Sequence, residues 1–305
     1  MSWSEDNLHR WLARRERPAC LIGSMGHDAA VLRPRAGRPV VCTDQVVAGV
    51  HATPETSAAR LGRKAAARAL SDLAATAARP HALLLALRAP AETSEDYLRK
   101  LIAAVDREGR RLGAPLVGGD LACSPGPLSL AVSAQGTLPG NRKPPGRDRV
   151  RAGHAILCTG PCGGSLLGRH LRIAPRLEQG RWLHRHGATA LMDVSDGLAW
   201  DLYRLGRASG VAIDLLQVPI HADARRASRQ SGRSALDHAL HDGEDHELLA
   251  AVPRAKLSTL LASADRAGMR MLPIGEAREG SGLTLVLDGV RRQWKPGQGG
   301  WKHGA

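Results

Sequence analysis

Six aspartates of this sequence share a local setting that suits them to hold cations. Most of them follow an apolar run or stand beside Gly, Ser or Thr, where a side chain can face a ligand. They are Asp28, Asp44, Asp72, Asp120, Asp193 and Asp196. Six carboxylates can converge only if cations neutralise them. Hard oxygen ligands in that number favour magnesium, and magnesium in turn indicates nucleotide phosphates.

The stretch from Ala190 to Ala199 contains two of these aspartates. It begins as an apolar run typical of a buried strand, turns at Ser195-Asp196-Gly197 and continues as a predicted helix over residues 198–208. Asp193 and Asp196 therefore lie where a strand ends and a helix begins, which is where open α/β proteins collect ligands. Unpaired N–H groups at a helix N-terminus also attract anions. A helix cap worth about 1 kcal/mol is the simpler alternative for Ser195 or Asp196.

Several other chemistries lack their signatures. No G-x-x-x-x-G-K-[ST] or G-x-G-x-x-G motif is present, and the glycine-rich turn at residues 160–164 has neither spacing. The histidines and carboxylates of residues 241–247 lack the HExxH spacing of a transition-metal site. The five cysteines form no CxxC pair, which disfavours a disulfide framework or a zinc ribbon.

Composition narrows the class of protein further. A chain of 305 residues with 43% hydrophobic residues is globular and long enough for about two domains. No apolar run reaches the roughly 18–20 residues of a membrane span, and the acidic N-terminus does not resemble a signal peptide, so we expect a cytoplasmic protein. A net charge of +14 raises nucleic acid as a partner. The chain has no Phe, two Tyr and no helix-turn-helix or zinc-finger spacing, so phosphorylated small ligands, or simply an arginine-rich proteome, explain the charge better.

Alternating strand and helix patterns predict an α/β chain. Two predicted strands stop at candidate ligands: residues 40–44 at Asp44, and residues 115–117 at the sequence Gly118-Gly119-Asp120. Helices are expected at residues 3–16, 56–78, 92–112 and from Ser165. Residues 139–153 are rich in Pro, Gly and Arg, which predicts a linker between domains at residues 1–138 and 154–305.

Seven segments resemble the motifs of the thiamine-monophosphate kinase family. In chain order they are Gly26–Ala30, Thr43–Asp44 with Gly49–His51, Leu70–Ala74, Gly118–Asp120, Ser124–Leu128, Asp193–Leu198 and Gly243–Leu248. They follow the family's order and cover nearly the whole chain. The wider superfamily includes aminoimidazole ribonucleotide synthetase, selenophosphate synthetase and a hydrogenase-maturation enzyme.

The resemblance implies an ATP-dependent enzyme that phosphorylates thiamine monophosphate to thiamine diphosphate. It implies an α/β (α+β) two-domain synthetase-like fold, in which an N-terminal mixed-sheet domain binds ATP and metal and pairs with its twin in a homodimer, and a C-terminal α/β domain follows. The positions that match metal ligands are Asp28, Thr43, Asp44, Asp72, Asp120, Asp193 and Asp196. Those that match ATP contacts are Gly119, Arg147 and Ser195, and those that match contacts to thiamine monophosphate are His51, Glu244 and Trp301.

The implied chemistry is direct in-line phosphoryl transfer assisted by magnesium. The nucleophile, a phosphate oxygen, is already largely ionised at neutral pH, because its second pKa is about 6. No general base is needed, and bridging metal ions relieve the repulsion between the two anions. We therefore expect no covalent phosphoenzyme and no catalytic histidine.

Four positions depart from the family pattern. His27 replaces a second aspartate, His246 a tyrosine, Ala52 an aromatic residue and Gly164 an aspartate. His27 could be a tolerated loop substitution, or it could lower the number of metal ions or change the substrate. Two alternatives therefore stay open: another ATP-using kinase or synthetase of the superfamily, and a degenerate nucleotide-binding relative without catalysis.

Overall fold

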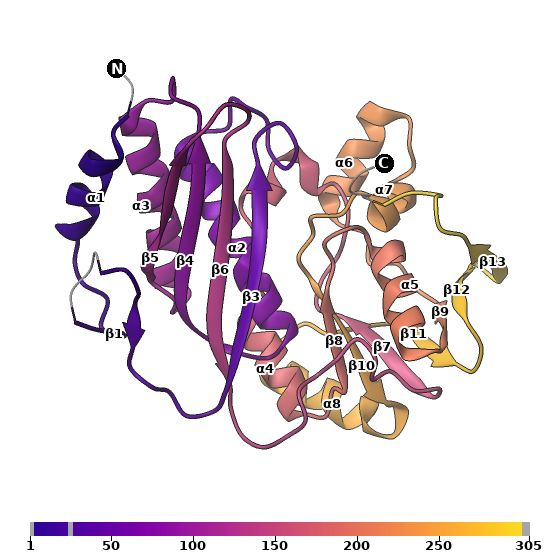
Figure 1. Ribbon diagram of the computed structural model, residues 1–305. Coiled ribbons are helices and arrows are strands. Elements are labelled where there is room, and N and C mark those ends of the chain that lie inside the picture. Colours follow the sequence, from indigo (N-terminus) through magenta and orange to yellow (C-terminus); the bar gives the residue numbers. More distant parts are fainter. Residues whose placement is uncertain (1–2, 24–26, 301–305) are drawn as a thin grey trace. The chain divides into compact units, whose positions relative to one another are not determined.

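The computed structural model describes residues 3–23 and 27–300, and the chain forms two compact units (Figure 1). Unit 1 comprises residues 1–73 and 78–141, and unit 2 comprises residues 74–77 and 142–305. The division between residues 141 and 142 falls within the predicted linker. The domain boundaries at residues 138 and 154 stay predictions.

Unit 1 is an α/β unit with a four-stranded sheet. Its elements, in chain order, are α1 (Glu5–Ala13), β1 (Leu21–Ile22), β2 (Val31–Leu32), β3 (Arg38–Val47), α2 (Ala58–Ala75), β4 (Arg79–Ala89), α3 (Glu95–Arg111), β5 (Leu116–Cys123) and β6 (Ser129–Leu138). The strand order is β3-β6-β4-β5; β4 and β5 pair in parallel, and the other neighbours pair antiparallel. The predicted mixed sheet is confirmed.

The two faces of this sheet differ because side chains alternate along each strand. Helices α2 and α3 lie along one face, where Leu83, Leu85, Leu130 and Val132 are buried (Figure 1). The side chains of the opposite face are exposed or half-buried. We call it the open face; its residues are Val41, Thr43, Gln45, Leu84, Ala86, Asp120, Ala131, Ser133 and Gln135.

Two strands run further than the sequence predicts. Strand β3 continues past Asp44 to Val47, and β5 continues through Gly119 and Asp120 to Cys123, so neither aspartate ends a strand. Glycine permits a close approach here, since a Cβ on Gly119 would lie 1.9 Å from the carbonyl oxygen of Leu85 in β4. The glycines therefore let β5 pair closely with β4 instead of stopping it.

Unit 2 contains a seven-stranded sheet. Its elements are β7 (His154–Cys158), the 3₁₀ helices η1 (Ser165–Leu167) and η2 (Arg169–Leu171), α4 (Leu177–Arg185), β8 (Ala190–Asp193), α5 (Leu198–Ser209), β9 (Ala212–Leu215), α6 (Ala222–Ser231), α7 (Ala235–His241), β10 (Leu248–Pro253), α8 (Arg254–Arg266), β11 (Leu272–Arg278), β12 (Gly282–Leu287) and β13 (Val290–Trp294). The strand order is β13-β12-β9-β11-β7-β10-β8, antiparallel except between β9 and β12. No helix in the described part of the chain is long and apolar enough to cross a membrane.

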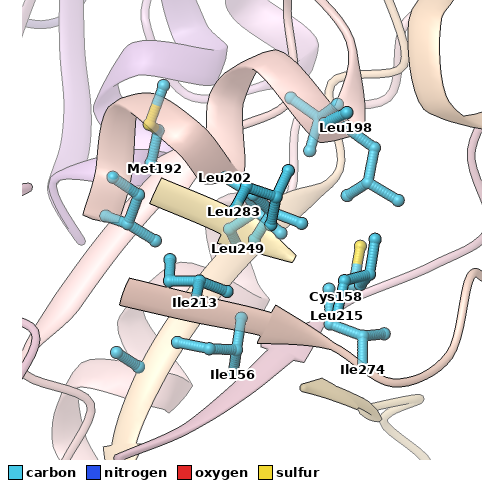
Figure 2. Close-up of a cluster of buried hydrophobic side chains, with 14 of the residues drawn as sticks. Ile156, Cys158, Met192, Leu198, Leu202, Ile213, Leu215, Leu249, Ile274 and Leu283 are labelled. Atoms are coloured by element: carbon cyan, nitrogen blue, oxygen red, sulfur yellow. The ribbon is translucent and has the colours of Figure 1, made fainter. Parts of the chain in front are cut away.

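The core of unit 2 lies between its sheet and α5. Leu198, Leu202 and Leu205 recur at helical spacing on α5, and all three are fully buried. They pack with strand residues such as Ile156, Met192, Ile213, Leu249 and Ile274 (Figure 2). Burying a leucine side chain contributes roughly 1.5–3 kcal/mol. The core therefore fixes the start of α5, and with it the turn that carries Asp196.

The helices of three regions of unit 2 differ from the sequence prediction. The helix expected from Ser165 is a pair of 3₁₀ turns separated by Gly168, whose φ of +109° does not fit a continuous α-helix. Helices α4 and α6 have no counterpart in the prediction. Helix α6 buries only Ala224 and Ala227, so it lacks the apolar stripe from which helices are predicted.

Candidate active site

The motif Asp193–Leu198 forms a turn whose backbone is hydrogen-bonded to a buried side chain. Strand β8 ends at Asp193, and residues 194–197 lead into α5. Asp201, in the first turn of α5, accepts hydrogen bonds on Oδ2 from the backbone N–H groups of Ser195 (3.0 Å) and Asp196 (2.9 Å). The backbone under Asp196 is therefore fixed by a side chain that sequence reasoning missed.

Asp201 is fully buried, and its pKa is raised to about 8 by that burial and by the nearby charge of Asp196. The carboxyl group is thus largely protonated at neutral pH and keeps an acceptor oxygen for the turn. The sequence signal that could have identified Asp201 is its position in the first turn of a helix, where acidic residues complement the helix dipole.

Asp196 has an internal cation beside it. Arg204, two turns along α5, donates a hydrogen bond from Nη1 to Oδ2 of Asp196 and lies 3.6 Å from Oδ1 of Asp201. The guanidinium also lies over the Trp200 ring, with its carbon 5.2 Å from the ring centroid, which is within the range of a cation–π interaction. Arg204 therefore neutralises part of the negative charge at this turn.

A second loop, residues 242–247, lies against the first. The N–H groups of Glu244 and His246 donate to the carbonyl oxygens of Ser195 (2.7 Å) and Val194 (2.8 Å). Both donors have positive φ, +54° and +51°, which is an uncommon conformation for residues with side chains. The loop backbone thus brings Glu244 to the same end of β8 as Asp193.

His246 is buried between two carboxylates. Its Nδ1 lies 3.2 Å from Oδ2 of Asp193, and its Nε2 lies 3.6 Å from Oε2 of Glu244. Burial alone would lower the pKa of the imidazole, but the carboxylates of Asp193 and Glu244 outweigh it and raise the pKa to about 9. His246 is therefore an imidazolium at neutral pH and joins a candidate metal ligand to a candidate substrate contact.

Two further buried acids fix the loop of residues 242–247 to the turn at residues 159–164. Glu247 accepts hydrogen bonds from the Thr159 hydroxyl (2.6 Å) and Arg176 Nε (2.9 Å). Asp245 accepts from the Gly163 N–H (2.9 Å) and Arg169 Nη2 (2.8 Å). Burial raises the pKa of Asp245 to about 6, although Arg169 opposes the shift.

Gly164, where the resembled family has an aspartate, is required by this local fold. Its φ is +71°, and a Cβ there would lie 2.2 Å from the backbone carbon of Asp223. A side chain at this position therefore does not fit the observed arrangement.

In unit 1, Asp44 is already paired with a cation. Arg68 of α2 donates from Nε to Oδ2 (2.8 Å) and from Nη2 to Oδ1 (3.1 Å) of Asp44 on β3. Oδ1 also accepts from the N–H of Gln45 (2.7 Å). This two-bond fork is the strong form of an arginine–carboxylate pair.

The other candidate ligands of unit 1 are spread over the sheet and its surroundings. Asp120 and Thr43 lie on the open face, but on β5 and β3, the two edge strands. Asp28 lies in a loop with a fully exposed side chain 3.9 Å from the ring of His27. Asp72 is half-buried on α2, one turn beyond Arg68.

The remaining predicted contacts have mixed settings. His51 accepts the Val47 N–H on Nδ1 (3.1 Å), and its carbonyl accepts from the buried ammonium of Lys64 (2.5 Å). Arg147 is exposed, and Gly119 lies within β5. Trp301 lies outside the described residues.

The structure thus gathers the candidates of unit 2 and disperses those of unit 1. Asp193, Ser195, Asp196 and Glu244 share two adjoining loops. Among residues 3–23 and 27–300, no group of three or more His, Cys, Asp or Glu side chains is placed to hold a metal ion. The predicted metal ligands are therefore not one assembled set within these residues.

Comparison with known proteins connects this arrangement to a family. Residues 26–138 match the AIR synthase related protein, N-terminal domain. The chain is 37% identical to the thiamine-monophosphate kinase of Rhodopirellula baltica, over 77% of each protein. The crystal structure of the kinase from Stenotrophomonas maltophilia is similar with a TM-score of 0.77 and 33% identity, over 96% of this chain and 99% of that one.

A third comparison involves a protein solved with ligands. AaThiL complexed with AMPPCP and TMP is similar to this chain with a TM-score of 0.76 and 25% identity, over 98% of this chain and 95% of that one. The structural and the sequence similarity both point to the family that the motifs of residues 26–248 resemble. The chain belongs to the thiamine-monophosphate kinase family.

Proposed function

We propose that this chain is an ATP-dependent kinase that converts thiamine monophosphate to thiamine diphosphate. The observation that carries the proposal is its similarity, over 98% of its length, to a protein solved with both AMPPCP and TMP. Two curated relatives, which align with 77% and 89% of this chain, are named thiamine-monophosphate kinase. A cytoplasmic location, expected from the sequence, is part of the proposal.

The transfer needs positioning more than acid–base chemistry. The attacking oxygen of thiamine monophosphate is already ionised, so the protein must align it with the γ-phosphate of ATP and reduce the repulsion between them. No histidine has to remove a proton, and His246 is unsuited to that role, because two carboxylates hold it in the protonated form.

The donor chemistry of the predicted ligands suits magnesium. Carboxylate and hydroxyl oxygens are the ligands it prefers, and when bound it would neutralise phosphate charge. The residues that would hold it are Asp28, Thr43, Asp72 and Asp120 of unit 1 and Asp193 and Asp196 of unit 2. Asp44 fits less well, because Arg68 already occupies both of its oxygens.

Roles for the remaining candidates follow from their settings. We assign to an ATP phosphate Ser195, whose N–H is bonded to Asp201, and to thiamine monophosphate Glu244, whose N–H is bonded to the Ser195 carbonyl. Gly119, Arg147, His51 and Trp301 keep the roles that the resemblance implies.

We also infer a homodimer that pairs through the open face of unit 1. Val41 and Leu84 are 76% and 45% exposed on this face, and no described helix of unit 1 covers it. An exposed apolar sheet face commonly marks a protein interface. The variant Val41→Lys should raise the monomer fraction in light scattering, whereas Val290→Lys, at a similarly exposed valine of β13, should not. A monomeric unmodified chain would contradict the inference.

The function is tested by ADP release from ATP and magnesium, with and without thiamine monophosphate. We expect thiamine monophosphate to stimulate release and thiamine diphosphate to appear. A folded protein that binds ATP but does not respond to thiamine monophosphate would favour another substrate of the superfamily. ATP binding with no turnover for any acceptor would favour the non-catalytic alternative.

A further inference from the structure

We propose that Arg68 is a built-in cation that occupies Asp44, so that this carboxylate does not take a divalent ion of its own. The inference deepens the proposed function, on which it rests for the expectation that metal ions bind near these aspartates. It assigns to this chain one metal ligand fewer than its motifs suggest.

The geometry of the pair is that of a closed site. Nε and Nη2 of Arg68 each donate to a different oxygen of Asp44, at 2.8 and 3.1 Å. The Gln45 N–H takes a further position on Oδ1. A carboxylate offers about four lone-pair positions, and three of them are filled here.

Burial makes this pair more than a surface contact. The side chains of Arg68 and Asp44 are only 12% and 23% exposed. Arginine stays protonated at any pH the protein tolerates, so the charge at this point is permanent. A divalent ion at Asp44 would have to displace the guanidinium or lie beside it, and charge repulsion opposes the second arrangement.

The pair sets Asp44 apart from two other candidate metal ligands of unit 1, Asp28 and Asp120. Within the described residues, Asp120 and Asp28 form no ion pair with a lysine or arginine. Asp72 follows Arg68 by four residues on α2, so the guanidinium lies on its side of the helix. The built-in cation therefore acts at Asp44, and its charge extends to the next turn of the helix.

The test counts bound Mn²⁺, a spectroscopic substitute for magnesium, on the full chain with and without AMPPCP. With Arg68 retained, Asp44→Asn should bind the same number of ions as the unmodified protein. In Arg68→Met, which keeps a side-chain stem but removes the charge, one additional ion per chain should bind. Asp44→Asn added to Arg68→Met should abolish that additional ion.

Thermal unfolding provides a second readout, since an ion that binds the folded state raises the melting temperature. Mn²⁺ should stabilise Arg68→Met more than the unmodified protein. The matched control is Arg60→Met, which removes an exposed arginine from the same helix and should behave as the unmodified protein does.

Two results would overturn the inference. One is the loss of a bound ion when Asp44→Asn is made alone, with Arg68 retained. This measurement does not depend on whether an Arg68 variant folds. The other is an unchanged ion count and affinity in folded Arg68→Met. Neither measurement uses thiamine monophosphate, so a failure of the proposed kinase activity is distinguishable from a failure of this inference.

Discussion

The two units hold their candidate ligands in opposite ways. In unit 2, Asp193 and Asp196 lie on a turn whose backbone is bonded to the buried Asp201 and to the loop of residues 242–247. In unit 1, Asp28 and Asp120 are exposed on a loop and on an open sheet face. The aspartates resemble one another in sequence, yet Asp28 and Asp120 lie outside the kind of buried polar network that holds Asp193 and Asp196.

This difference indicates that stability and ligand binding depend on the same residues around Asp193 and Asp196 in unit 2. At Asp28 and Asp120 in unit 1, ligand binding is separate from stability. A buried network rigidifies when every group is satisfied and costs stability when one partner is lost. Substitutions in unit 2 should therefore change both folding and function. Substitutions at the exposed aspartates of unit 1 should change function alone.

The largest expected effect tests whether both units contribute to turnover. Asp120→Asn and Asp196→Asn should each lower turnover roughly 100-fold or more, because each removes a charge from a site that must neutralise phosphate. The kinetic control is Asp96→Asn, an exposed aspartate of α3. Nearly unchanged turnover in both variants would contradict the metal assignment.

The next effect concerns the stability of unit 2. Asp201→Ala should destabilise the protein by about 3 kcal/mol, since the N–H groups of Ser195 and Asp196 lose a buried acceptor. Asp201→Asn should cost less than about 1 kcal/mol, because the native carboxyl group is largely protonated and an amide oxygen can replace it. Denaturant unfolding measures both, and equal losses would show that Asp201 does not act through these bonds.

The pH dependence of stability gives a smaller effect. The pKa of His246 is raised from 6.5 to about 9, so the folded state holds a proton that the unfolded state releases. Its contribution is complete below pH 6.5 and is lost as the pH rises to 9. Asp201, raised from 3.8 to about 8, acts in the same direction at lower pH.

Without divalent ions, the free energy of unfolding should therefore fall by roughly 4 kcal/mol between pH 6.5 and 9. His246→Gln should flatten the fall, whereas His9→Gln, at an exposed histidine of α1, should not. A flat profile in the unmodified protein would show that His246 does not bridge charged carboxylates.

The smallest effect completes the comparison. Asp28→Asn should change the free energy of unfolding by less than about 0.5 kcal/mol, because the side chain is fully exposed. Its turnover should nevertheless fall. A loss of stability comparable to that of Asp201→Ala would remove the distinction between the units.

The sequence predicted most of the fold because apolar periodicity follows the core directly. The helix from Leu198 and the strand that ends at Asp193 are confirmed, since buried leucines and strand residues set both patterns. Helix α6 was missed because it buries too little to show a stripe. The end of β5 was predicted wrongly because Gly118 and Gly119 signal a break unless the neighbouring strand is known to approach closely.

The candidate site was predictable as residue types and motifs, and less so as geometry. The strand–turn–helix pattern indicated Asp193 and Asp196, and the family motif added Glu244; the structure brings all three to adjoining loops. Arg68 and Arg204 could not be predicted, because each acquires its partner only when a helix packs or turns toward an aspartate. Tertiary contacts of long side chains leave no pattern in a single sequence.

The most direct test of the central claim follows the phosphoryl group itself. Full-length protein is incubated with magnesium, thiamine monophosphate and ATP labelled in its γ-phosphate. The account predicts label in thiamine diphosphate, in proportion to ADP formed, and none on the denatured protein. Label found only in inorganic phosphate, or attached to the protein, would contradict direct transfer to thiamine monophosphate.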